Sequence, residues 1–268
     1  IKEMAKSVVA NDSERQTKIA KIIKRHFTKR GVLYKDLQSY KVLMELKEAE
    51  SDFAKRIISE VRRDRDRLNT QNIFSEQSKL MFEYHADIVR YMGYGQQFQD
   101  FKINIHISGR QGPAGIKAVL PRLSKEARNC ITIENDENRW GLSDSLELAD
   151  DVALVLDVHH HWCREGEYIE ATDDRVKRVI DSWRGVRPAM HLSMSRDDYL
   201  HGHRTDVLPD YHQLLETGHQ KGTLRAHSDY IWNSAVTDWA GSFRDDFDIM
   251  VEAKAKNLAS IPFEEATR

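Results

Sequence analysis

The chain has 268 residues, of which 40% are hydrophobic, and a formal net charge of -2, so it is long enough to bury a sizeable core. No stretch approaches 18 uninterrupted apolar residues, and the first 30 residues carry charges throughout. These features exclude a transmembrane span and an apolar signal core, so we expect a folded cytoplasmic protein with no membrane partner. Cys130 and Cys163 are too few for a disulfide framework or a thiolate metal site, and both are expected to be reduced.

Charge is divided unequally along the chain. Residues 1–70 hold 18 Lys and Arg against 11 Asp and Glu, or +7, which leaves 23 against 32, or -9, for the remainder. A basic segment beside an acidic, His-rich one suits a protein that contacts phosphate and also holds divalent metal. Solvated helices can carry the same charges, so this pattern alone decides nothing.

The first 92 residues contain no proline and one glycine, Gly31, which predicts helices. Helical spacing and caps place them at about 2–10, 13–30, 33–48, 51–67 and 74–92. We therefore expect a basic helical segment over 1–67 and a second domain over 68–268. The segment 18–30 could lie along a DNA backbone, or it could be an ordinary solvated amphipathic helix.

After Gly93, short β-rich runs alternate with helical stretches. The runs predict five strands, at 103–109, 130–135, 152–161, 187–195 and 248–254. Strands that alternate with helices indicate parallel βαβ units, hence an α/β fold that is either a doubly wound sheet or a (β/α) barrel. A barrel is favoured because every run carries an ionisable residue at or near its carboxyl end, where barrel enzymes keep their chemistry.

These strand-end residues are nitrogen and oxygen donors: His106, Glu134, Asp157, His160, His161, His191 and Glu252, with His227 in a loop before the last strand. A single one would most often be a hydrogen-bonded core group. Several at the same level of successive strands would be unfavourable unless a cation neutralised them, which predicts a metal site.

The donor set also limits the metal. Three or four imidazoles with three carboxylates and no thiolate suit Mn²⁺, Zn²⁺ or Fe²⁺, and they exceed the needs of one ion. Two or three ions are expected, with Glu134, in the middle of the strand order, as the bridging carboxylate. Clustered divalent ions typically serve phosphodiester hydrolysis, where they activate water and stabilise the leaving oxygen.

Seven segments resemble, in order and spacing, the second half of the UV damage endonuclease family: FEYHADIVRYMG (82–93), INIHISG (103–109), IENDE (133–137), LDVHHHWC (156–163), RPAMHLS (187–193), RAHSDYI (225–231) and DIMVEAKAK (248–256). The resemblance implies a TIM-type (β/α)8 barrel with up to three metal ions, usually manganese, with Zn²⁺ or Mg²⁺ as alternatives. It also implies cleavage of damaged double-stranded DNA on the 5′ side of a lesion.

Carried over position by position, the resemblance implies metal ligands at His106, Glu134, Asp157, His160, His191, His227 and Glu252. Glu134 and Lys254 are the expected catalytic residues, with Lys254 facing a phosphate. A solvated lysine after the last strand is the alternative for Lys254. For His159, where the family usually has an apolar residue, we expect an outward or packing role.

The chain departs from the family in two respects. Only five of the eight barrel strands are visible, and the early His-Pro motif, which supplies another ligand, has no counterpart before Pro113. Ala189 stands where the family has a lysine close to the metals. A half barrel exposes two sheet edges, which the helices of 1–67, a second copy or a partner chain would have to cover.

Three functions remain open on these grounds. The first is a metal-dependent DNA repair endonuclease. The second is a catalytically impaired protein that binds DNA or a partner on a half-barrel scaffold, which Ala189 and the missing strands favour. The third is another reaction on the same barrel, such as a sugar isomerase or a zinc-dependent abasic-site endonuclease, which the IENDE and DVHHH motifs fit less well.

Overall fold

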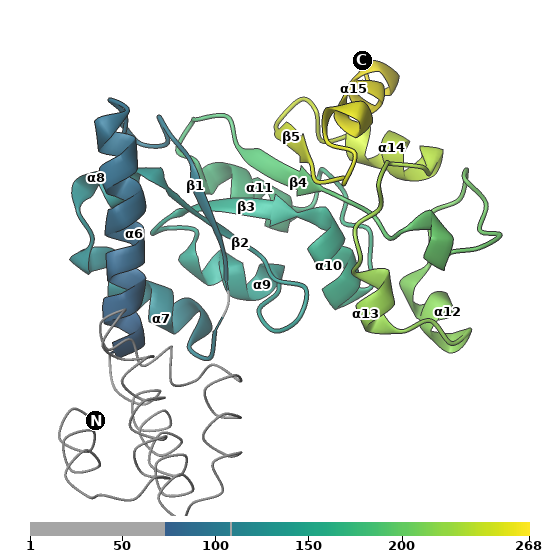
Figure 1. The fold of residues 1–268 in the computed structure, drawn as a ribbon, viewed down its shortest axis with the longest axis horizontal. Coiled ribbons are helices and arrows are strands. Elements are labelled where there is room, and N and C mark those ends of the chain that lie inside the picture. Colours follow the sequence, from purple (N-terminus) through teal and green to yellow (C-terminus); the bar gives the residue numbers. More distant parts are fainter. Residues whose placement is uncertain (1–72, 108) are drawn as a thin grey trace, which may run out of the picture. The chain divides into compact units, whose positions relative to one another are not determined.

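The described part of the protein, in a computed structural model, comprises residues 73–107 and 109–268, with side chains from Ser78 onward. A parallel five-stranded sheet in the order β1-β2-β3-β4-β5 organises it (Figure 1). The predicted basic segment 1–67, with its helices and its boundary at 68, lies outside the described residues. In the part that is described, no helix is long and apolar enough to cross a membrane.

The five strands follow the predicted order and are all parallel. They span β1 Ile103–His106, β2 Ile131–Glu134, β3 Ala153–Asp157, β4 Ala189–Leu192 and β5 Asp248–Val251. The predicted α/β fold is therefore confirmed. Because β1 and β5 form the two edges of the described sheet, these residues do not close a barrel, as the count of five strands predicted.

One strand prediction is wrong in its second half. The run 152–161 was expected to be extended throughout, but β3 ends at Asp157 and a helix, α10, occupies Val158–Glu165. The Asp157 side chain accepts a hydrogen bond from the His160 backbone N–H at 2.7 Å and so caps the helix. His159, His160 and His161 therefore lie on a helix that starts where the strand stops.

Helices connect the strands. They are α6 Ile73–Tyr91, α7 Gly112–Val119, α8 Lys125–Cys130, α9 Leu142–Ser145, α11 Asp174–Ser182, α12 Tyr211–Glu216, α13 Lys221–Leu224, α14 Ser234–Gly241 and α15 Asn257–Ala266, with short 3-10 turns at Leu120–Arg122, Leu146–Leu148 and Asp197–Tyr199. α6 agrees with the helix predicted over 74–92. Both cysteines are free and buried, as expected.

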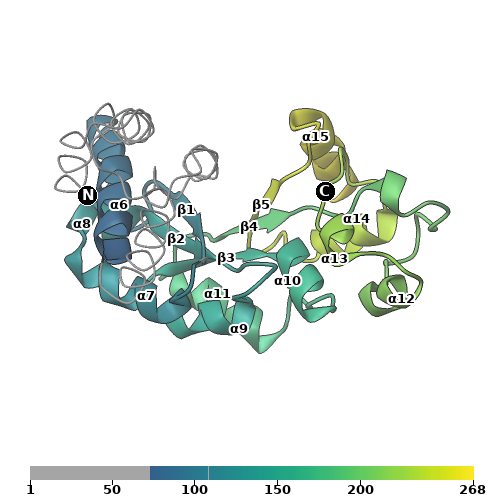
Figure 2. The same cartoon turned by 60° about the horizontal axis from the view of Figure 1, so that its bottom comes forward.

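The main core lies between the sheet and helices α7, α9 and α11, which lie along one face of the sheet in Figure 2. Leu154 and Leu156 of β3 point into this core, where Val176 and Val179 of α11 are fully buried. This packing fixes the strand register, because a shift by one residue would turn the apolar side chains to the other face. The carboxyl ends of the strands are thereby fixed at the same height in the sheet.

The opposite face of β3 and β4 carries a smaller apolar cluster. Ala153, Val155 and Ala189 pack there with Trp183, and Phe98 lies against them. Trp183 is fully buried, and its indole N–H donates to the Leu154 carbonyl at 2.6 Å. The amino-terminal half of this face is therefore filled by the chain's own aromatic residues, and the polar groups lie at the other end of the strands.

Candidate metal centre

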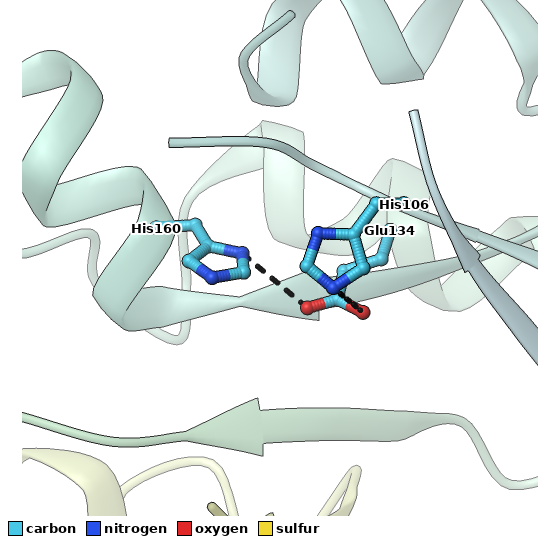
Figure 3. A group of neighbouring side chains, drawn as sticks. All are labelled: His106, Glu134 and His160. Carbon is cyan, nitrogen blue, oxygen red and sulfur yellow. Dashed lines mark ion pairs between the residues drawn. The ribbon is translucent and has the colours of Figure 1, made fainter. Parts of the chain in front are cut away.

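Strand register brings the predicted donors to one level of the sheet. His106 and Glu134 are paired across β1 and β2, and Asp157 and His191 are paired across β3 and β4. Figure 3 shows His106, Glu134 and His160 converging from β1, β2 and α10. Glu252 follows directly after β5. Parallel strands end on the same side of a sheet, so donors that are distant in sequence become neighbours.

Glu134 lies at the centre of this group and is fully buried. Its Oε1 is 3.3 Å from His160 Nδ1 and 3.2 Å from His191 Nδ1, and its Oε2 is 3.5 Å from His106 Nε2. Burial alone would raise the pKa of Glu134, but the ion pairs with His160 and His191 hold it well below its usual range. A carboxylate is thus kept ionised in the interior by the imidazoles around it.

Asp157 is also fully buried, and its two oxygens differ in environment. Oδ1 caps α10, whereas Oδ2 has no hydrogen-bond partner and lies 3.6 Å from His160 Nδ1. The pKa of Asp157 is raised to about 7, mainly by burial and in part by the charge of Glu134, against the opposing effect of His160. Two buried carboxylates this close favour a cation between them.

Three buried atoms in this region make no geometrically acceptable hydrogen bond, namely Glu134 Oε1, Asp157 Oδ2 and His191 Nδ1, although Glu134 Oε1 and His191 Nδ1 lie 3.2 Å apart as an ion pair. These same three residues offer ligand atoms that all lie within 4.8 Å of one another, as do His106, Glu134 and His160. Unpartnered donors of the oxygen and imidazole type fit a divalent cation of the Mn²⁺ or Zn²⁺ kind. The oxygen and imidazole donors gathered here therefore suit a divalent metal ion.

His160 and His191 are the imidazoles that pair with the buried carboxylates. Burial alone would lower the pKa of His160, but its contacts with Glu134 and Asp157 raise it to about 10. The pKa of His191 is raised in the same way, by Glu134 and Glu252, against the effect of burial. The His160 imidazole is therefore protonated near neutral pH when no cation is bound.

The donors near β5 are held more loosely. Glu252 Oε1 lies 3.2 Å from His191 Nδ1, and the Glu252 side chain is 37% exposed. His227 contacts the backbone carbonyl of Glu252 through Nδ1 at 3.0 Å, and its ring centre is 6.3 Å from that of His160. Lys254 is exposed and lines an open hollow of about 490 Å³ with His227 and Glu252. These three predicted residues thus lie at the rim.

The other two histidines of the triple run have different partners from those of His160, although the His159 ring lies 5.7 Å from that of His227. His159 is buried, its ring stacks on Trp162 at 5.7 Å, and burial lowers its pKa to about 3. The His161 Nε2 lies 3.1 Å from Glu167 Oε1, in the segment between α10 and α11. His159 therefore has a packing role, which is one of the two roles expected for it. His161 links α10 to the segment before α11.

Several polar neighbours were not singled out from the sequence. Asn104 donates from Nδ2 to Glu134 Oε2, and the Thr132 hydroxyl donates to Asn104 Oδ1 at 2.9 Å. Asn104 stands two residues before His106, so the period of a strand could have placed it on the same face. Asp136 and Glu137, with His106, form a third group of ligand atoms within 4.8 Å. Their position in the sequence, directly after Asn135 and Glu134, was the signal that could have identified them as site residues.

The sequence matches the profile of the family described as UV-endonuclease UvdE over residues 69–265. Among curated proteins, the chain is 25% identical over 191 residues to a UV DNA damage endonuclease of Bacillus cereus, an alignment that covers 67% of this chain and 52% of that protein. It is 24% identical over 191 residues, with the same coverage, to UV DNA damage endonucleases of Bacillus thuringiensis and Bacillus anthracis. The chain thus spans about half the length of these relatives.

A solved structure described as "Crystal Structure of SacUVDE" is also similar. The match has a TM-score of 0.48 and 20% sequence identity, and it covers 85% of this chain and 70% of that chain.

Proposed function

Because the chain belongs to the UV-endonuclease UvdE family, we propose that it is a metal-dependent endonuclease that hydrolyses a phosphodiester of double-stranded DNA on the 5′ side of a UV lesion. The Bacillus relatives are endonucleases by name. The observation that carries the metal dependence is the convergence of three unpartnered buried atoms, Glu134 Oε1, Asp157 Oδ2 and His191 Nδ1. A divalent cation among these groups would neutralise the two buried carboxylates, which the neighbouring imidazoles do only while they are protonated.

The proposed metal ligands are the strand-end donors His106, Glu134, Asp157, His160, His191, His227 and Glu252. Mn²⁺ is the proposed metal, with Zn²⁺ or Mg²⁺ as alternatives, in two or three ions. When bound, such ions activate water and stabilise a leaving alkoxide. His160 must release a proton before it can act as a ligand, so metal uptake is coupled to proton release.

The residues of the chain itself have distinct proposed roles. Glu134 contacts three imidazoles from three elements, which suits a carboxylate shared between ions. Lys254, exposed beside Glu252, is proposed to contact a phosphate oxygen of the substrate. The segment 1–67 is proposed to add sequence-independent phosphate contacts. A cytoplasmic location, and a second copy or partner at the open sheet edges, remain predictions.

The test is nicking of a supercoiled plasmid by the purified chain. With Mn²⁺, ultraviolet-irradiated plasmid should be nicked, and mapping of the cuts on an end-labelled duplex should place them 5′ of the lesion. Chelation by EDTA should stop the reaction, and Mn²⁺ in excess should restore it. Equal nicking of irradiated and unirradiated DNA would remove the lesion specificity, and nicking that survives full metal removal would remove the metal dependence.

A second candidate is a scaffold that binds DNA or a partner without cleaving it. Its support is Ala189, which is buried against Val155 and Trp183 at the position where the family resemblance expects a lysine near the metals. DNA binding without any nicking, unaffected by Glu134→Ala, would favour this candidate over the nuclease.

A further inference from the structure

Asn135 follows the central carboxylate Glu134 directly and is fully buried. Its side chain makes two hydrogen bonds to the backbone of one residue, 22 positions further along the chain. Nδ2 donates to the Asp157 carbonyl at 2.9 Å, and Oδ1 accepts from the Asp157 N–H at 2.9 Å. The amide thus acts as an additional strand partner beyond Glu134 and Val155, the last aligned pair of β2 and β3.

The backbone of Asn135 makes a third connection. Its carbonyl oxygen lies 3.0 Å from His160 Nδ1, and only a protonated Nδ1 can donate there. His160 then presents Nε2 as its free lone pair when the ring is neutral. Nε2 lies on the side of Glu137, whose Oε2 is 3.7 Å away. The contact therefore favours a proton on Nδ1, as do Glu134 Oε1 at 3.3 Å and Asp157 Oδ2 at 3.6 Å, and leaves Nε2 of His160 available.

Asp157 completes the linkage, because its side chain caps α10 at His160. A shift of the Asp157 backbone would move both its unpartnered Oδ2 and the first turn of α10. Three predicted ligands, Glu134, Asp157 and His160, are in this way positioned relative to one another through one buried amide. Groups beyond the ligands that orient them typically change metal affinity when they are removed.

We infer that Asn135 is a positioning residue of the metal centre, which sets the spacing of Glu134 and Asp157 and the ligating nitrogen of His160. The inference rests on the proposed metal dependence but does not require nuclease activity. An alternative is that Asn135 only stabilises the fold, as buried amides often do. The two are separated by asking whether its loss affects metal binding or stability alone.

The matched control is Asn233, which is also fully buried and makes the same kinds of bond. It caps α14 through the Val236 N–H at 3.0 Å and donates to the Val207 carbonyl at 2.8 Å. Asn135→Ala and Asn233→Ala remove the same atoms and leave comparable cavities. Thermal unfolding of the metal-free proteins shows how far each variant is destabilised.

Mn²⁺ affinity is then measured by calorimetry, well below the melting temperature of each variant. Asn135→Ala should bind Mn²⁺ about 10- to 100-fold more weakly than the unchanged chain, whereas Asn233→Ala should bind it normally. Unchanged affinity in Asn135→Ala, or an equal loss in both variants, would overturn the inference.

A second measurement needs no variant at position 135. In the unchanged chain loaded with Zn²⁺, ring ¹⁵N NMR should find the His160 proton on Nδ1 and the metal on Nε2, with the signal assigned by its loss in His160→Gln. A proton on Nε2 would contradict the selection of the nitrogen by Asn135. Metal binding without nicking overturns only the nuclease, whereas a chain that binds neither Mn²⁺ nor Zn²⁺ overturns both proposals.

Discussion

The central and the edge strands of the sheet hold their donors differently. On β2 and β3, Glu134 and Asp157 are fully buried. Asn104 donates a hydrogen bond to the Glu134 carboxylate, and Asn135 both donates to and accepts from the Asp157 backbone. On the edge strands, the His106 side chain is 48% exposed, and that of Glu252, just after β5, is 37% exposed. A strand with neighbours on both sides fixes its end groups, whereas an edge strand leaves them free to adjust. We therefore expect removal of central donors to have larger effects than removal of edge donors.

The largest effect is expected from Glu134→Gln. This substitution keeps the shape of the side chain but removes the charge that three imidazoles contact. Mn²⁺ affinity should fall at least about 100-fold, and nicking should be lost, because a ligand matters at least as much as the groups that orient it. Calorimetry measures the Mn²⁺ affinity, and the plasmid assay measures nicking. The control is Glu264→Gln on α15, which breaks ion pairs with Arg244 and Arg268. It should change neither the Mn²⁺ affinity nor nicking.

A comparison of Asp157→Asn with Glu252→Gln tests the contrast directly. Both substitutions remove one carboxylate charge. The amide introduced by Asp157→Asn can still cap α10 through its oxygen. Mn²⁺ affinity should fall by about 100-fold for the central change and by about tenfold for the edge change, over the range seen for metal-site substitutions. The same titration measures both. A larger loss of Mn²⁺ affinity in Glu252→Gln than in Asp157→Asn would show that burial does not determine how much each donor contributes to metal binding.

The metal-free protein should also depend on pH through the central histidines. The pKa of His160 is raised from 6.5 to about 10, mainly by Glu134 and Asp157 against the effect of burial. A raised pKa contributes stability that is complete below 6.5 and is lost as pH rises through about 10. Urea unfolding with EDTA present should therefore give a falling free energy of unfolding over this interval. His160→Gln should flatten the curve, and an equally steep curve in that variant would assign it to other groups.

The smallest effect is expected from Lys254→Ala at the rim. Lys254 is exposed beside Glu252, so Mn²⁺ affinity should stay unchanged. If the side chain contacts one phosphate, the salt dependence of DNA binding should become less steep by about one unit of log-log slope. Fluorescence anisotropy at several salt concentrations measures this. Lys177→Ala on α11 makes the same change of charge away from the centre and should leave the slope unaltered.

The sequence was informative about the site because strands and their ends are local features. The alternation of β-rich and helical runs predicted five parallel strands, and the donors at their carboxyl ends then had to lie near one another. Asn135 could not be predicted in this way, because its partner Asp157 is 22 residues away and the bond depends on the register of two strands. The end of β3 was misplaced for a related reason, since the capping of α10 by Asp157 outweighed the extended pattern.

By itself, the sequence determined the parallel α/β fold, the family of the chain and the oxygen and imidazole donors to which a divalent metal is assigned. Tertiary structure alone decided which donors are buried and which are exposed. It placed Glu134 among three imidazoles, stacked His159 on Trp162, and filled the face around Ala189 with Trp183. The physical reason is that residue types carry the chemistry of a site, whereas its charges and distances arise only when separate strands pack together.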